Sequence, residues 1–155
     1  MEELIKAIDI LKNKFPNIKL IIIGDGPLKK DLKKLVNSLT INNYINFKAW
    51  VSKAEKTYLL NSSELIIESA QEQDFSHFLI ECLLLGKNIL ATNSPYHQEI
   101  LGKQAIFIDG QTPAEIAQKI SLIFDFDKSQ TVVADRFSQA EHFNKLQKIF
   151  ESITK

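Results

Sequence analysis

The segment from residue 69 to residue 81 (SAQEQDFSHFLIE) holds the side chains that could most readily do chemistry. Its polar residues stand between a short apolar run and a longer one, and Glu81 is a carboxylate within the apolar run 75–85. A charge in such a setting needs an ion pair or a bound ligand. A carboxylate can accept both hydrogen bonds of a vicinal diol such as ribose, and the residues alone leave the two interpretations equal. Ser76 and His77 stand near a helix start, where backbone N–H groups can hold a phosphate.

A second candidate is the turn Gly24-Asp25-Gly26-Pro27, which follows an apolar run and opens a helix. Gly24 and Gly26 would let the backbone approach a ligand closely, although a tight turn alone explains them as well. Lys29 stands where a dinucleotide-binding fingerprint needs its third glycine, which argues against a dehydrogenase or epimerase. The Gly-Lys-Ser/Thr of a phosphate-binding P-loop is absent from the sequence.

Other chemistries find less support. His97 and Glu99 have the spacing of a metal-binding pair, but no third ligand stands nearby, so we predict no metal site. A Gly-x-Ser-x-Gly nucleophile elbow is absent, which argues against a serine hydrolase. Cys82 is the single cysteine, and we expect it to be a small buried residue rather than a reactive thiol.

Predicted strands and helices alternate along the chain and would hold these residues in place. Short apolar runs predict strands over residues 19–23, 44–50, 64–68, 88–91 and 105–108. Apolar residues at helical spacing predict helices over residues 3–15, 27–39, 52–60, 75–85 and 113–124, followed by one or two more up to residue 153. The strand 19–23 is expected to be buried on both faces. Ser52 and Glu55 have the spacing of a capping box, and Thr112 is expected to cap the helix that follows it.

This alternation indicates an α/β fold in which helices flank a parallel sheet through right-handed βαβ crossovers. Ligands of such sheets bind beyond the carboxyl ends of the strands. The loops to inspect are therefore 24–26, 48–51, 69–76, 92–97 and 109–110.

Composition limits the class of protein. The 155 residues predict one domain, and 19 basic residues balance 19 acidic ones, which argues against nucleic acid as a partner. No apolar run approaches the ~20 residues that a membrane-spanning helix needs. The acidic N-terminus and the single cysteine favour a cytoplasmic location.

Several groups of residues follow one another in an order known from one family. They are residues 4–7, Pro16, residues 20–27, residues 45–47 with 50–51, residues 75–81, Gly86, residues 89–92 and residues 99–100. Together they resemble the C-terminal domain of retaining glycosyltransferases of the GT-B fold, in family 4, the glycosyl transferases group 1. The resemblance covers nearly the whole chain. It implies that residues 1–155 form a single Rossmann-like donor-binding domain, one half of a GT-B enzyme whose N-terminal acceptor domain is absent here.

The resemblance also implies roles for individual residues. The family signature is two glutamates separated by seven residues, with Gly-Phe-Gly after the first. The second glutamate, which holds the ribose, falls on Glu81, and the first, which contacts the donor sugar, falls on Gln73. Backbone amides around Phe75, Ser76 and His77 would meet the diphosphate. The loop with Trp50 and Val51 would lie against the base, and Gly24 and Gly26 belong to the opening segment of the site.

The chain departs from the family pattern at three positions. Gln73 lacks the charge of the first glutamate, and Asp74-Phe75-Ser76 replaces Gly-Phe-Gly. The basic pair with which the family neutralises the diphosphate stands upstream of the first residue here. These departures favour a degenerate, non-catalytic subunit that binds a partner or an acceptor, whereas Glu81 favours a catalytic parent.

The leading interpretation is thus the donor-binding domain of an enzyme that transfers a sugar from a nucleotide-sugar to a glycan, a lipid-linked molecule or a protein. The nucleotide-sugar is a substrate, and no resident cofactor is expected. Catalysis would require the missing domain, so this chain alone would be inactive. Any membrane contact, at the inner face, would come through the parent protein.

Overall fold

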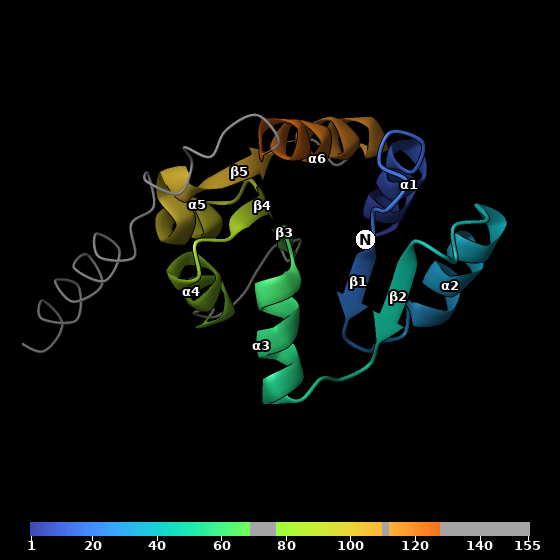
Figure 1. Cartoon of the computed structure of the whole chain (residues 1–155), viewed down its shortest axis with the longest axis horizontal. Coiled ribbons are helices and arrows are strands. Elements are labelled where there is room, and N and C mark those ends of the chain that lie inside the picture. Colours follow the sequence, from blue (N-terminus) through green and yellow to red (C-terminus); the bar gives the residue numbers. More distant parts are fainter. Residues whose placement is uncertain (69–76, 110–111, 128–155) are drawn as a thin grey trace, which may run out of the picture. The chain divides into compact units, whose positions relative to one another are not determined.

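Helices and strands alternate along the chain in the computed structural model, which describes residues 1–68, 77–109 and 112–127 (Figure 1). The elements are α1 (Glu2–Leu11), β1 (Leu20–Ile23), α2 (Lys29–Ser38), β2 (Ile45–Lys48), α3 (Lys53–Ser62), β3 (Leu65–Glu68), α4 (His77–Leu84), β4 (Asn88–Thr92), α5 (Pro95–Leu101), a 3-10 turn (Gly102–Gln104), β5 (Ala105–Ile108) and α6 (Pro113–Asp127). The expected α/β class with parallel strands and flanking helices is confirmed. The strands form two hydrogen-bonded sheets, β1-β2 and β3-β4-β5, and each lies in its own compact unit.

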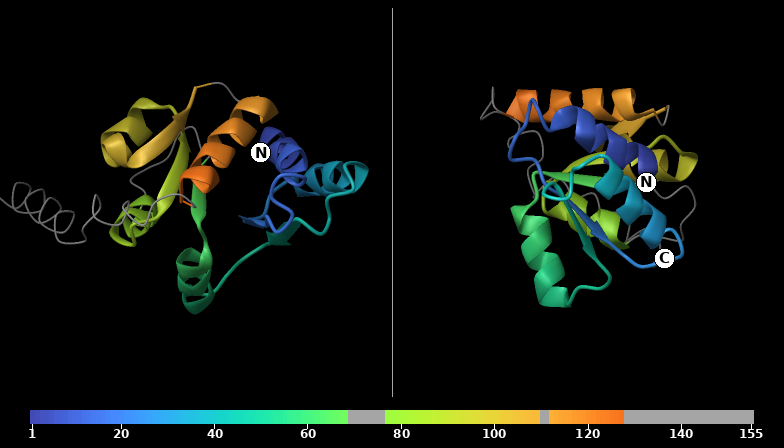
Figure 2. Two further views of the ribbon diagram at one scale, coloured as in Figure 1. Left: turned by 45° about the horizontal axis from the view of Figure 1, so that its top comes forward. Right: turned by 90° about the vertical axis from the view of Figure 1, so that its right-hand side faces the viewer.

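The first unit contains residues 1–59 and 108–122. Strands β1 and β2 pair in parallel, with Leu20 opposite Ile45 and Ile23 opposite Lys48. Helices α1 and α2 lie side by side (Figure 2). The apolar residues of α1 recur every three or four positions, which places them on one face of the helix. That face is buried: Leu4, Ile5, Ile8 and Leu11.

One expectation for this unit is wrong, because β1 is not buried on both faces. Ile21 and Ile23 are 37% and 47% exposed, whereas Leu20 is half-buried. Side chains alternate between the two faces of a strand. Among the described residues, the face that carries Ile21 and Ile23 is therefore incompletely covered, and a β-branched run alone does not establish that a strand is buried on both sides.

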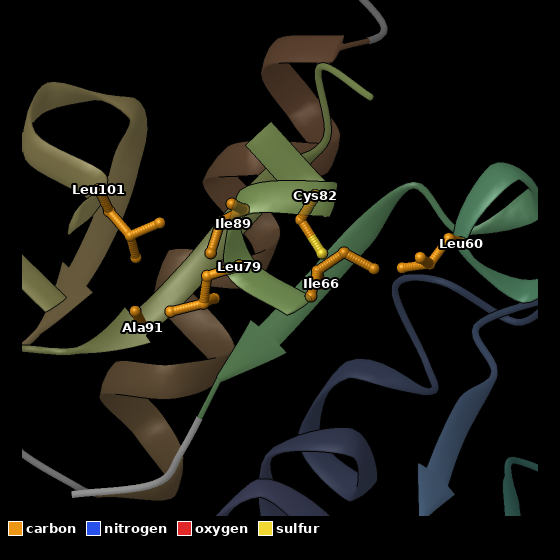
Figure 3. Packing of buried hydrophobic residues seen from close by; sticks show 7 residues of the cluster. All are labelled: Leu60, Ile66, Leu79, Cys82, Ile89, Ala91 and Leu101. Carbon is orange, nitrogen blue, oxygen red and sulfur yellow. The ribbon is translucent and has the colours of Figure 1, made fainter. Parts of the chain in front are cut away.

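Of the described residues, the second unit contains 60–68, 77–107 and 123–127. Strands β3 and β4 pair in parallel, with Leu65 opposite Asn88 and Glu68 opposite Ala91, and β4 also neighbours β5. A hydrophobic cluster packs α4 and the neighbouring segments onto this sheet (Figure 3). Its buried members are Leu60, Ile66, Leu79, Cys82, Ile89, Ala91 and Leu101. Cys82 is fully buried, as expected.

Helix caps agree with the sequence in part. The Ser52 hydroxyl accepts a hydrogen bond from the Glu55 N–H at 3.1 Å, and Thr112 does the same for Glu115 at 3.2 Å. The Glu55 carboxylate, however, binds Lys48 Nζ at 2.7 Å, a bond that the capping-box interpretation did not include.

Helix α5 was missed, because its first residues were expected to be loop. Ser94 and Pro95 carried a usable signal, since serine favours the N-cap and proline the first helical turn. The helices expected beyond residue 127 lie outside the described residues. In the described part of the chain, no helix is long and apolar enough to cross a membrane.

Candidate functional site

The turn after β1 is open and leaves room for a ligand. Gly24 has φ +141°, a conformation that L side chains rarely adopt, and its N–H donates to the Lys48 carbonyl at 2.9 Å. A Cβ atom at Gly24 or at Gly26 would meet nothing within 4 Å. Gly24 therefore serves the backbone conformation of this turn, and its surroundings are not crowded.

The same turn already contains an anion of its own. The Asp25 carboxylate accepts a hydrogen bond from the Gly26 N–H at 2.9 Å and lies 3.2 Å from Lys29 Nζ. The Gly26 hydrogen bond, followed by Lys29, holds the pKa of Asp25 below its usual value. Because this carboxylate uses the Gly26 N–H, a phosphate would have to displace it to bind there.

The loop after β2 presents the single tryptophan to solvent. Trp50 is 89% exposed, and Val51 is half-buried. The loop is bracketed by the ion pair between Lys48, the last residue of β2, and Glu55 in the first turn of α3. Such a surface pair contributes about 1 kcal/mol at most. It fixes the loop at both ends and leaves the indole ring free to meet a planar ligand.

Helix α4 places two of the expected residues one turn apart. His77 is exposed at the first position of the helix, and Glu81 is half-buried four residues later. Residues four apart lie on the same face of a helix. Leu79 and Cys82 occupy the opposite side and are both fully buried. The core therefore orients α4 so that His77 and Glu81 turn away from the hydrophobic cluster.

Three of the expected site residues lie outside the described residues. They are Gln73, Phe75 and Ser76, from the segment between β3 and α4. Their roles stay predictions that rest on the resemblance.

The first turn of α5 contains a buried polar side chain, His97, which the sequence suggested only as a weak metal ligand. His97 is 1% exposed, and its Nδ1 lies 2.8 Å from the carbonyl oxygen of Thr92. Glu99, by contrast, is exposed. Within residues 1–68, 77–109 and 112–127, no three His, Cys, Asp or Glu side chains are grouped to hold a metal ion.

A cavity of about 260 Å³ lies elsewhere, between α2 and β2. It is lined by Lys33, Val36, Asn37, Asn42, Ile45 and Phe47. Its residues include the first residue of β2 and the loop before it, whereas ligands of open parallel sheets bind beyond the last residues of the strands. We therefore do not assign it to the expected site.

Comparison with known proteins supports one family. The family described as glycosyl transferases group 1 matches residues 1–140. An uncharacterized glycosyltransferase of Methanocaldococcus jannaschii is 32% identical over 90 residues, which cover 58% of this chain and 22% of that protein.

Solved structures agree on the fold. The Anabaena protein HepE, in complex with UDP, has a TM-score of 0.68 and 18% identity over 97% of this chain and 44% of its own. The catalytic domain of cholesterol-alpha-glucosyltransferase from Helicobacter pylori has a TM-score of 0.72 and 20% identity over 92% of this chain and 88% of its own. The chain thus spans less than half of HepE and about a fifth of the archaeal relative.

Proposed function

Because the chain belongs to the glycosyl transferases group 1 family, we propose that it binds the nucleotide-sugar donor of an enzyme that transfers the sugar to a glycan, a lipid-linked molecule or a protein. The family match over residues 1–140 carries this proposal. Glu81 supports it, because a half-buried carboxylate one turn into α4 suits the two hydroxyls of a ribose. The UDP bound by HepE makes a uridine nucleotide the first to test.

Each remaining residue has a separate role in the proposal. Trp50, with Val51, stacks on the base, since an exposed indole offers a flat apolar face. The first N–H groups of α4, around His77, meet the diphosphate. Gln73 contacts the sugar. Gly24 and Gly26 shape the turn after β1. A phosphate that binds the Gly26 N–H displaces the Asp25 carboxylate from it.

The domain that binds the acceptor belongs, in this proposal, to a part of the enzyme beyond residues 1–155. The donor is a substrate, and no resident cofactor or metal takes part. The enzyme works on the cytoplasmic side, and its other domain makes any membrane contact.

A second candidate function is a non-catalytic subunit that binds a partner or an acceptor. Gln73 favours it, because an amide replaces the first carboxylate of the family signature. Binding of a nucleotide by this chain would be compatible with both functions, whereas sugar transfer by a longer protein that contains this chain would exclude the second.

The test uses the fluorescence of Trp50, which is the only tryptophan in the chain. UDP, GDP, ADP and their sugars are titrated, and we expect one base to quench the emission. Glu81→Gln should weaken that ligand about 10- to 100-fold, as the loss of a charge-assisted hydrogen bond of about 1.5–3 kcal/mol implies.

Glu64→Gln is the matched control, because this exposed carboxylate precedes the amino end of β3. It should leave the affinity unchanged. Ligand-observed NMR separates the two parts of the proposal: binding without quenching would remove Trp50 from the site and keep the donor. If the chain binds none of the nucleotides, the proposal fails.

A further inference from the structure

His97 lies where the second unit would meet its ligand. Strands β3 and β4 run in parallel, so their carboxyl ends, Glu68 and Thr92, lie at the same edge of the sheet. The turn of Thr92, Asn93 and Ser94 leaves this edge and leads into α5. Ligands of open α/β sheets bind at that edge.

Hydrogen bonds from the first turn of α5 hold this turn in place. The His97 ring bonds the Thr92 carbonyl at 2.8 Å, and the His97 backbone N–H donates to the Ser94 hydroxyl at 3.1 Å. The Gln98 side chain donates to the Asn93 carboxamide oxygen at 2.5 Å. His97 therefore bonds both ends of the turn, and the Gln98 backbone N–H also donates to the Ser94 carbonyl at 2.9 Å.

The hydrogen-bond partner of His97 Nδ1 shows which of the two ring nitrogens carries the hydrogen. A carbonyl oxygen only accepts, so Nδ1 must carry the hydrogen, and in the neutral ring Nε2 is left as an acceptor. Nε2 is shielded from solvent, and none of the described residues donates to it. Buried polar atoms are rarely left in this state. A phenyl ring would fill the same space without an unpaired atom, so packing alone does not account for a histidine at this position.

We propose that His97 is a positioning residue, which holds the turn of Thr92, Asn93 and Ser94 against the sugar part of the bound donor through the hydrogen bond from Nδ1 to the Thr92 carbonyl. The inference rests on the proposed function. The turn suits a sugar rather than a phosphate, because its three side chains are neutral and polar and can exchange hydrogen bonds with hydroxyl groups.

Three substitutions separate positioning from packing. In His97→Asn the carboxamide nitrogen takes the place of Nδ1 and can still donate to Thr92. In His97→Gln it takes the place of Nε2 instead. His97→Phe keeps the shape of the ring and loses both nitrogens. Each variant of the whole chain is checked by circular dichroism and thermal unfolding before ligand is added.

The ligands are the nucleotide-sugar that binds most tightly in the Trp50 titration and the nucleoside diphosphate with the same base. For His97→Phe and His97→Gln we expect the affinity for the nucleotide-sugar to fall about tenfold, equivalent to about 1.4 kcal/mol. The affinity for the nucleoside diphosphate should stay within about twofold. His97→Asn should recover most of the loss.

The outcomes distinguish this inference from the proposed function. If the unsubstituted chain binds no nucleotide, both fail. If it binds, but the variants lose both ligands in proportion to a fall in thermal midpoint, His97 has a structural role only and this inference alone fails. The same conclusion follows if His97→Asn binds the nucleotide-sugar no better than His97→Phe and His97→Gln do, or if no variant changes the affinity for the nucleotide-sugar.

Discussion

The Asp25 carboxylate shows how a side chain that looked like part of a ligand site serves its own turn. Its hydrogen bond from the Gly26 N–H and its contact with Lys29 favour the charged form, so the folded chain holds its pKa below the usual aspartate value of 3.8. A lowered pKa in the folded state stabilises the fold above the pKa of the unfolded chain. This contribution is lost as the pH falls through the lower, folded value.

We therefore predict that Asp25→Asn lowers the thermal midpoint slightly at neutral pH and that its curve meets that of the unsubstituted chain under acid conditions. Thermal unfolding between about pH 2.5 and pH 7 measures the convergence. Lys29→Met is the companion variant. The Gly26 bond is the larger cause of the shift, so this variant should keep most of the pH dependence. An equal loss in the two variants would contradict that order.

Residue types predicted local roles well and tertiary roles poorly. The Ser52 cap and the burial of Cys82 followed from the sequence, because a cap depends on residues three apart and a cysteine within an apolar helix has few alternatives. The partner of Glu55 did not follow, since Lys48 reaches it across a loop. The burial of His97 did not follow from the sequence either, because it depends on tertiary packing and not on the neighbouring residues in the chain.

Helix α4 is the element on which the proposed site depends most. Its inner face joins the hydrophobic cluster of the second unit through Leu79 and Cys82, while His77 and Glu81 occupy the other side. The position of the two polar side chains is thus a consequence of apolar packing. Weakening that packing should disturb the fold and the ligand site together.

We predict that Leu79→Ala lowers the free energy of unfolding by about 2–5 kcal/mol, because the side chain is completely buried and its removal leaves a cavity. Leu85→Ala, one residue beyond α4, is the matched control. This leucine is 40% exposed, and its truncation should cost about 0.5 kcal/mol. Urea unfolding followed by circular dichroism measures both. Equal effects would show that α4 does not pack through the face assigned here.

Element types were easier to predict than their ends or their surroundings. Hydrophobic periodicity identified β5 with its full bounds and nine other elements within a few residues. It failed for the seven-residue α5, whose short apolar pattern resembles a loop. It also failed for the surroundings of β1, because periodicity records which residues are apolar and not what covers them.

For the whole molecule, the order of motifs carried more information than any one motif. Each segment of the resemblance is short, and the family match over residues 1–140 confirms that they belong together. The division of the strands between two sheets was not visible in the sequence, because strand pairing is a long-range property. The roles of Gln73, Glu81 and Trp50 stay predictions, which only ligand measurements can test.

Sugar transfer requires, in the proposed function, a larger protein than residues 1–155. Catalysis in the proposed enzyme stabilises the leaving diphosphate between donor-binding and acceptor-binding parts, so this chain alone should turn over no nucleotide-sugar. A longer protein that joins this chain to an acceptor-binding domain should transfer or hydrolyse it, as measured by release of the nucleoside diphosphate. In that protein Glu81→Gln should lower kcat/KM by about 10- to 100-fold, the loss expected for one charge-assisted hydrogen bond. The Glu64→Gln control should retain full activity.

If the longer protein binds the nucleotide-sugar but never turns it over, the non-catalytic subunit becomes the better explanation. Gln73→Glu is then the substitution with which to seek a gain of activity.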